Sequence, residues 1–173
     1  MIEKVKASIR NVPDFPKKGI MFRDITTAIK DKEVLKLIVD YLAEQLKDKK
    51  IDYIVSIESR GFIFGSALAY KIGAGLVLIR KPGKLPAKTI SQTYDLEYGT
   101  DEIQMHEDAV EAGANVVVVD DLLATGGTVC AAIKLLQKAK ANVLAACFVI
   151  ELEKLSGKSK LPEGVELISM IKY

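Results

Sequence analysis

The sequence contains little of what metal centres and catalytic thiols need. It has one histidine and two cysteines among 173 residues, and Cys130 and Cys147 are neither spaced as metal ligands nor accompanied by a nearby catalytic histidine. We therefore expect both cysteines to be reduced, buried small side chains.

Long apolar segments and a strong charge of either sign are also absent. The apolar run VLAACFVI is far shorter than the roughly 20 residues of a membrane helix, and the first residues lack the apolar core of a signal peptide. With 25 Lys+Arg against 23 Asp+Glu, the net charge of +2 argues against a general nucleic-acid or membrane binder. We expect a cytoplasmic protein, and any anion site must be local.

What is present suits a single compact domain over residues 1–173, with 49% hydrophobic content. Apolar patterns of helical and strand type alternate along the chain. The predicted elements are helices over residues 31–46, 61–73 and 125–140, and strands over residues 51–57, 75–80, 115–121 and 142–151. This order predicts an α/β fold, with a parallel sheet flanked by helices and a ligand site beyond the carboxyl ends of the strands.

A polar segment over residues 81–100 interrupts the alternation. It contains Pro82, Gly83, Pro86 and Gly99, and it is longer than a simple connection needs to be. We interpret it as a functional loop that orders over the site as a lid.

The stretch VVVVDDLLATGGT places two carboxylates at the end of a predicted strand and small residues where the next helix begins. This segment suits a phosphate monoester, because it offers the backbone N–H groups of Gly126 and Gly127, the hydroxyls of Thr125 and Thr128, and the positive end of the helix dipole. Two carboxylates beside an anion must face something else, such as vicinal hydroxyls or a divalent cation. A ribose 5-phosphate meets both needs.

Other nucleotide and phosphate folds fit the stretch less well. No lysine follows the glycines as in a Walker A motif, and Gly73-Ala74-Gly75 precedes a strand instead of following one. Too few residues follow Asp121 for a response-regulator receiver domain, in which a double aspartate lies near the start.

VVVVDDLLATGGT resembles the 5-phosphoribosyl 1-pyrophosphate motif of the type I phosphoribosyltransferases. Four further segments resemble, in order and spacing, the members of that family that act on adenine: FPKKGIMFRDIT, IVSIESRGFIFG, GLVLIRKPGKLP and YDLEYG. The resemblance runs from about Val12 to the last residue. It implies the type I phosphoribosyltransferase fold, with a central parallel β-sheet, a small hood from the N- and C-terminal segments, and a flexible loop.

The same resemblance implies a reaction of adenine with 5-phosphoribosyl 1-pyrophosphate to give AMP and pyrophosphate, with Mg²⁺ as cofactor and a homodimer as the assembly. Asp120 and Asp121 would approach the ribose hydroxyls and stabilise an oxocarbenium-like state. The implied ribose 5-phosphate site consists of Asp120, Asp121, Ala124, Thr125, Gly126, Gly127 and Thr128.

Cations are implied for the leaving pyrophosphate. Ser59 and Arg60 follow one predicted strand, and Arg80, Lys81 and Lys84 follow the next. The family also has a cis peptide at the position of Glu58-Ser59, which we expect here. Mg²⁺ would bridge pyrophosphate and ribose oxygens and need few protein ligands, with Asp120 or Asp121 as candidates.

The base site is implied at Met21, Phe22, Arg23 and Leu122, where Phe22 would stack on adenine and Leu122 would close the other side. Without the resemblance, Phe22 would be interpreted as a core residue. Glu97 matches the family's loop carboxylate near purine N7, which makes it a catalytic candidate beside Arg60 and the aspartates. Its neighbour Tyr98 offers the alternative of only ordering a closed lid.

Two other functions are compatible with this fold. A phosphoribosyltransferase for a 6-oxopurine lacks the FRDI segment combined with a late Glu-Tyr loop, and a ligand-sensing regulator would add a DNA-binding module that we do not find. His106 falls outside every matched segment, and we expect it to be structural.

Overall fold

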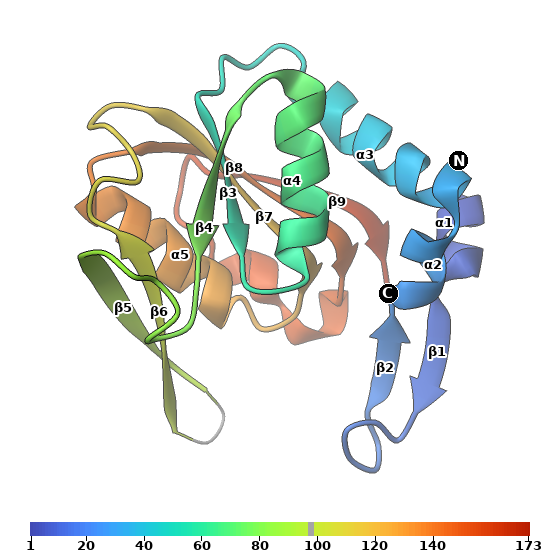
Figure 1. Cartoon of the computed structure of the whole chain (residues 1–173). Helices are drawn as coiled ribbons and strands as arrows, with labels where there is room; N and C mark the ends of the chain where they lie inside the picture. The colour runs from blue at the N-terminus through green and yellow to red at the C-terminus, as the bar shows by residue number, and fades with distance from the viewer. Residues whose placement is uncertain (97–98) are drawn as a thin grey trace.

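The computed structural model describes residues 1–96 and 99–173, and a five-stranded parallel sheet forms its centre (Figure 1). The strand order is β4-β3-β7-β8-β9, and every neighbouring pair is parallel. The strands are β3 (Tyr53–Ile57), β4 (Gly75–Ile79), β7 (Asn115–Leu123), β8 (Asn142–Glu151) and β9 (Glu166–Lys172). The α/β architecture predicted from the sequence is therefore confirmed.

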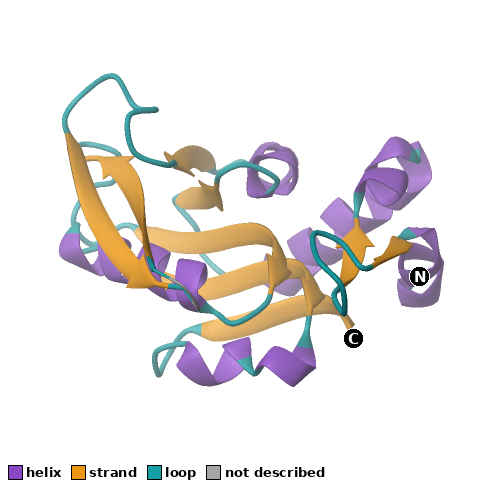
Figure 2. Cartoon of the chain, turned by 90° about the horizontal axis from the view of Figure 1, so that it is seen from below, coloured by secondary structure: helices purple, strands orange, loops and turns teal. Residues whose placement is uncertain are grey.

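Helices cover both faces of this sheet (Figure 2). Successive residues of the β-branched run in β7 point to opposite faces, so Val117 and Val119 join one core while Val116 and Val118 join the other. The first core includes residues of α3 (Lys32–Leu46) and α4 (Gly61–Ile72), and the second includes residues of α5 (Gly127–Lys138). A strand buried on both faces explains why its sequence is continuously apolar.

The helix ends follow the signals in the sequence. The Asp31 side chain accepts hydrogen bonds from the N–H groups of Glu33 and Val34 and so caps α3. Gly73 adopts the left-handed conformation, with φ 73°, and ends α4. The helix expected from residue 125 begins instead at Gly127, because Gly126 is left-handed with φ 81° and belongs to the preceding loop.

The N-terminal segment before α3 contains further helices and strands. They are α1 (Ile2–Ser8), β1 (Arg10–Pro13), β2 (Met21–Asp24) and α2 (Thr26–Lys30). β1 and β2 form an antiparallel hairpin, and Val5, Ile9 and Ile25 from this segment are buried in the same core as residues of β9. This is the hood implied by the family resemblance.

The polar segment over residues 81–100 contains a strand that the sequence did not predict. β5 (Thr89–Asp95) pairs in antiparallel fashion with β6 (Thr100–His106). The hairpins β1–β2 and β5–β6 project on opposite sides of the carboxyl ends of the central strands (Figure 1). Two short 3-10 turns, η1 (Glu153–Leu155) and η2 (Gly157–Lys160), follow β8.

One expectation about the cysteines is corrected. Both are free, but only Cys147 is buried. Cys130 is half-buried on the first turn of α5, where its thiol donates a hydrogen bond to the Lys160 carbonyl at 2.9 Å. Among the described residues, no helix is long and apolar enough to cross a membrane.

Candidate active site

The loop between β7 and α5 forms a small cavity of about 80 Å³ at the carboxyl end of the sheet. A single water needs about 10–15 Å³, so a group of phosphate size fits. Residues from both the acidic and the small part of the predicted motif line this cavity, together with Phe148: Asp120, Leu122, Leu123, Ala124, Thr125, Gly126, Gly127, Thr128 and Val129. The structure thus brings all residues of the predicted phosphate site except Asp121 around one cavity at the N-terminus of α5.

Gly157, which sequence reasoning missed, lies against this loop. A Cβ atom at Gly157 would lie 2.3 Å from the Ala124 carbonyl oxygen and 3.1 Å from the Gly126 nitrogen. A Cβ at Gly126 would in turn lie 2.6 Å from the Gly157 oxygen. Only two glycines allow the backbones to approach so closely. A lone glycine far along the chain carries no sequence signal of this contact.

The two aspartates lie side by side near the end of β7. Asp120 accepts a hydrogen bond from the Asp121 N–H at 2.8 Å, and the Asp121 residue is only 4% exposed. Burial raises the pKa of Asp120 well above its usual range, and the neighbouring Asp121 carboxylate adds to the effect. Burial also raises the pKa of Asp121, although the nearby Arg60 guanidinium opposes that rise.

Arg60 is part of the carboxylate cluster. It occupies the N-cap position of α4, and its Nε lies 2.8 Å from Asp121 Oδ2. Its guanidinium carbon also lies 5.6 Å from the centre of the Phe22 ring. In this structure Arg60 therefore lies between Asp121 and the expected base site. The resemblance implied instead that Arg60 is one of the cations that bind pyrophosphate.

Two of the three remaining predicted cations line a second cavity, of about 130 Å³. Arg80 and Lys81 contribute to its wall with Glu58, and the Glu58–Ser59 peptide beside it is cis, as expected. Arg80 Nε lies 3.2 Å from Glu58 Oε2, and the Lys81 N–H donates to the same oxygen at 2.8 Å. Burial alone raises the pKa of Glu58, but these hydrogen bonds outweigh it and lower the pKa.

Lys81 and Lys84 both belong to the β4–β5 connection, and Lys81 is the one of the two that lines this cavity. The Lys81 ammonium forms an ion pair with Asp101 and donates to the Tyr94 hydroxyl at 3.2 Å. Burial lowers the pKa of Lys81, but the two partners outweigh it and raise the pKa. The Lys84 carbonyl accepts a hydrogen bond from Arg80 Nη1 at 3.3 Å.

The two cavities share Asp120 and Thr128. A group that bridges them would therefore pass over Asp120, whereas Asp121 lines neither cavity. The phosphate-sized cavity lies at one end of this path, and the cationic cavity lies at the other. This order matches phosphate, sugar and pyrophosphate along one ligand.

The expected base-binding residues lie on β2 and at the end of β7. Phe22 is half-buried and makes an edge-to-face contact with Phe15, with ring centres 5.0 Å apart. Met21 is 46% exposed, and Leu122 is half-buried against the first core. Phe22 is thus not a core residue. Glu97 and Tyr98 lie outside the described residues.

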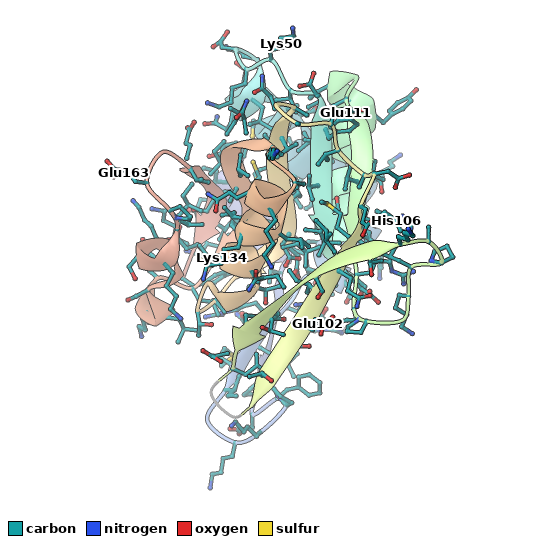
Figure 3. The ribbon with its side chains drawn as sticks, turned by 90° about the vertical axis from the view of Figure 1, so that its left-hand side faces the viewer. Lys50, Glu102, His106, Glu111, Lys134 and Glu163 are labelled. Carbon is teal, nitrogen blue, oxygen red and sulfur yellow. The ribbon has the colours of Figure 1, made fainter. Side chains whose placement is uncertain are left out.

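His106 ends β6 and lies near the end of its hairpin that is away from the tip (Figure 3). Its Nε2 accepts a hydrogen bond from the Ala87 N–H at 3.3 Å. The residue does not line either of the two site cavities. This contact agrees with the expected structural role.

Comparison with known proteins agrees with this geometry. The phosphoribosyl transferase domain family model matches residues 26–169. The adenine phosphoribosyltransferase of Citrifermentans bemidjiense is 53% identical, over 99% of this chain and 100% of its own length. That of Clostridium acetobutylicum is also 53% identical, over 98% of each chain.

Solved structures give the same result. Adenine phosphoribosyltransferase from Thermoanaerobacter pseudethanolicus superimposes with a TM-score of 0.97 at 50% identity over 100% of both chains. The enzyme from Saccharomyces cerevisiae, complexed with adenine and an imino-altritol bisphosphate, does so with a TM-score of 0.93 at 39% identity over 98% of both chains. The chain therefore belongs to the adenine phosphoribosyltransferases, within the phosphoribosyltransferase family.

Proposed function

We propose that this chain transfers the 5-phosphoribosyl group from 5-phosphoribosyl 1-pyrophosphate to N9 of adenine, releasing AMP and pyrophosphate. The observation that carries the proposal is the pair of cavities that meet at Asp120. One cavity suits a phosphate monoester, the other suits a more highly charged anion, and Asp120 lines both of them, with Asp121 next to it in β7.

The charges follow the course of the reaction. As the bond from C1 of the ribose to pyrophosphate breaks, positive charge develops on the sugar, and Asp120 and Asp121 lie where they stabilise it. Negative charge develops on pyrophosphate, next to Arg80 and Lys81. Binding pyrophosphate there requires the cations to exchange their present partners, Glu58 and Asp101, for the ligand.

The backbone of β2 supports adenine as the base. Residues two apart in a strand direct their carbonyl and N–H groups to the same edge, so the Met21 carbonyl and the Arg23 N–H share an edge. In the described chain, β1 and β2 form a sheet of two strands, which leaves one edge of β2 without a neighbouring strand. A carbonyl and an N–H in this order complement the 6-amino group and N1 of adenine, with Phe22 stacked on the ring.

Mg²⁺ is proposed as the cofactor. Within residues 1–96 and 99–173, no group of three or more His, Cys, Asp or Glu side chains could hold a metal ion by itself. The carboxylates of Asp120 and Asp121 are the protein oxygens that fit, and the remaining ligands would come from the substrate and water. When bound, Mg²⁺ neutralises charge on the pyrophosphate oxygens.

A homodimer and a cytoplasmic location complete the proposal. Four large apolar side chains are exposed on α4 and the edge strand β4: Ile63, Tyr70, Leu76 and Leu78. A cluster of this kind marks an interaction surface, and a second copy is its proposed partner. The half-buried free thiol of Cys130 suits a reducing compartment.

The experiment that tests the function is pyrophosphate release from 5-phosphoribosyl 1-pyrophosphate and Mg²⁺ with a panel of bases. Hypoxanthine and guanine carry an oxygen at C6 and a hydrogen on N1, so both backbone contacts of β2 would become mismatched. Each unpaired buried polar group costs about 1–3 kcal/mol, which predicts a preference for adenine of roughly 10²–10⁴-fold in kcat/KM. Efficient use of hypoxanthine would instead support the 6-oxopurine alternative.

A further inference from the structure

The guanidinium of Arg23 stacks on the ring of Tyr173, the last residue of the sequence. Its carbon lies 3.8 Å from the ring centre, which is well within the range of a cation–π contact. Arg23 Nη1 donates to the Asn11 side chain on β1, but Arg23 Nε is buried without a hydrogen-bond partner among the described residues. The aromatic face is therefore a principal contact of the buried side of this guanidinium.

Tyr173 itself is held firmly to the central sheet. Its N–H donates to the Glu151 carbonyl at 3.0 Å, and its carbonyl accepts from the Glu153 N–H at 3.0 Å. Lys6 adds a hydrogen bond from Nζ to the Lys172 carbonyl at 3.1 Å, and its ammonium lies 4.9 Å from the Tyr173 ring centre. The two backbone hydrogen bonds hold Tyr173 at the end of β9.

The hairpin on the other side of the contact needs such support. An isolated two-stranded hairpin is at best marginally stable in water. Helices α1 and α2 of the hood contribute buried residues to the first core. In β2, by contrast, Met21 is exposed and Phe22 and Arg23 are half-buried. Figure 1 shows the end of the chain beside the end of β2 that joins α2. The Arg23–Tyr173 contact thus attaches the base-binding strand directly to the sheet.

We propose that Tyr173 is a positioning residue for base recognition, because its ring fixes Arg23 and so the backbone of residues 21–23 that faces the base. The inference rests on the proposed function, in which that backbone recognises adenine. Tyr173 touches neither the phosphate cavity nor the cationic cavity. It therefore affects the binding of adenine and leaves the binding of 5-phosphoribosyl 1-pyrophosphate unchanged.

The test compares Tyr173→Ala with Tyr173→Phe in the full chain. Tyr173→Ala is expected to raise the KM for adenine by about 5- to 30-fold, the factor that a partly desolvated cation–π contact supplies. The KM for 5-phosphoribosyl 1-pyrophosphate should stay within about twofold of wild type, since no contact in its site changes. Tyr173→Phe keeps the ring and should behave as wild type.

Two further variants separate this role from general destabilisation. Lys6→Met removes the other cation at the ring and should leave the KM for adenine unchanged. Arg23→Met in the Tyr173→Ala background should add little to the effect of Tyr173→Ala alone, because both changes remove one contact. Additive effects of the two substitutions, or equal rises in both KM values, would overturn the inference.

Hydrogen exchange of the ligand-free protein gives a readout that does not depend on activity. The amides of residues 21–23 should exchange faster in Tyr173→Ala than in wild type or Tyr173→Phe. If wild type does not use adenine but this exchange still changes, the proposed function fails while the anchoring of β2 stands. If wild type uses adenine and neither its KM nor the exchange changes in Tyr173→Ala, the inference fails while the function stands.

Discussion

At the scale of single residues, the acidic pair shows how a functional site costs stability. Asp120 is hard to ionise in the folded chain because its half-buried carboxyl group is partly desolvated and lies beside another carboxylate. A carboxyl group whose pKa is raised by folding binds its proton more tightly in the folded state, so its contribution to stability is present at low pH and is lost as the pH rises through the folded pKa. At neutral pH this aspartate therefore opposes folding.

Asp120→Asn is expected to stabilise the ligand-free protein at pH 7 while lowering kcat about 10²–10³-fold, because the amide keeps the shape but loses the charge facing the sugar. The gain in Tm should shrink toward pH 4, where an unfolded aspartate also becomes protonated. Thermal unfolding without Mg²⁺ from pH 4 to 8, together with turnover, measures both effects.

Asp121→Asn is the matched comparison for this prediction. It should also lower turnover, but it breaks the 2.8 Å ion pair with Arg60 and leaves that guanidinium without its carboxylate. A smaller gain in Tm, or a loss, is therefore expected. A Tm of Asp120→Asn that did not change with pH relative to wild type would show that Asp120 ionises normally.

At the scale of elements, the phosphate loop depends on a turn that is distant in sequence. A Cβ at Gly157 would meet the Ala124 oxygen at 2.3 Å and the Leu123 Cδ1 atom at 3.0 Å. Since the nearest of these atoms belongs to the backbone, the clash can be relieved only if η2 or the loop moves. Displacement of about 1 Å in such a site costs up to 10²-fold in rate.

Gly157→Ala is therefore expected to raise the KM for 5-phosphoribosyl 1-pyrophosphate by about 10- to 100-fold. Gly164→Ala is the control, because Gly164 has a positive φ of 85° but open space around its Cβ position. This control should lower the Tm without changing that KM. Steady-state kinetics with saturating adenine distinguish the two, and an unchanged KM in Gly157→Ala would show that the loop tolerates the shift.

The elements also show how far sequence could lead. β8 was predicted with the bounds that the structure has, and β7 was predicted to within two residues, because strands buried on both faces are continuously apolar. β5 was missed because its side chains are mostly polar and none is fully buried. The β5–β6 pairing holds it by backbone hydrogen bonds, which leave no hydrophobic pattern to detect.

The candidate site, like the fold, could be predicted from the sequence only in part. The acidic pair and the glycines are contiguous, so their chemistry can be inferred from one segment. The pairing of Arg60 with Asp121, and of Lys81 with Asp101, joins residues that are distant in the chain. Such pairs depend on how the elements pack, and a single sequence contains no record of them.

At the scale of the whole molecule, the site lies at the carboxyl ends of the strands, and its parts come from segments that are distant in the chain. The N-terminal hairpin supplies the expected base site, and the β5–β6 hairpin supplies Tyr94 and Asp101 near the cations. The two hairpins flank the strand ends (Figure 1). Both elements must hold their positions for the two proposed substrates to be bound next to each other.

Unlike the polar site, the surface formed by β4 and α4 exposes large apolar side chains to water. Val77 and Ile79 of β4 enter the second core, so Leu76 and Leu78 point to the other face, the one that α4 covers. They are 42% and 37% exposed, and Tyr70 on α4 is 92% exposed. The far end of this edge strand is closed by β6, because Arg80 and Gln104 exchange backbone hydrogen bonds of 2.9 and 2.8 Å.

If a second copy covers this surface, Leu78→Lys should convert the proposed dimer into a monomer, because burying an unpaired ammonium is strongly unfavourable. Sedimentation velocity at micromolar concentration measures the change. Leu155→Lys is the control, since Leu155 is 46% exposed on η1, outside this surface, and it should sediment as wild type. A wild-type chain that sediments as a monomer would contradict the proposed homodimer, and a Leu78→Lys variant that stays dimeric would place the interface on another surface.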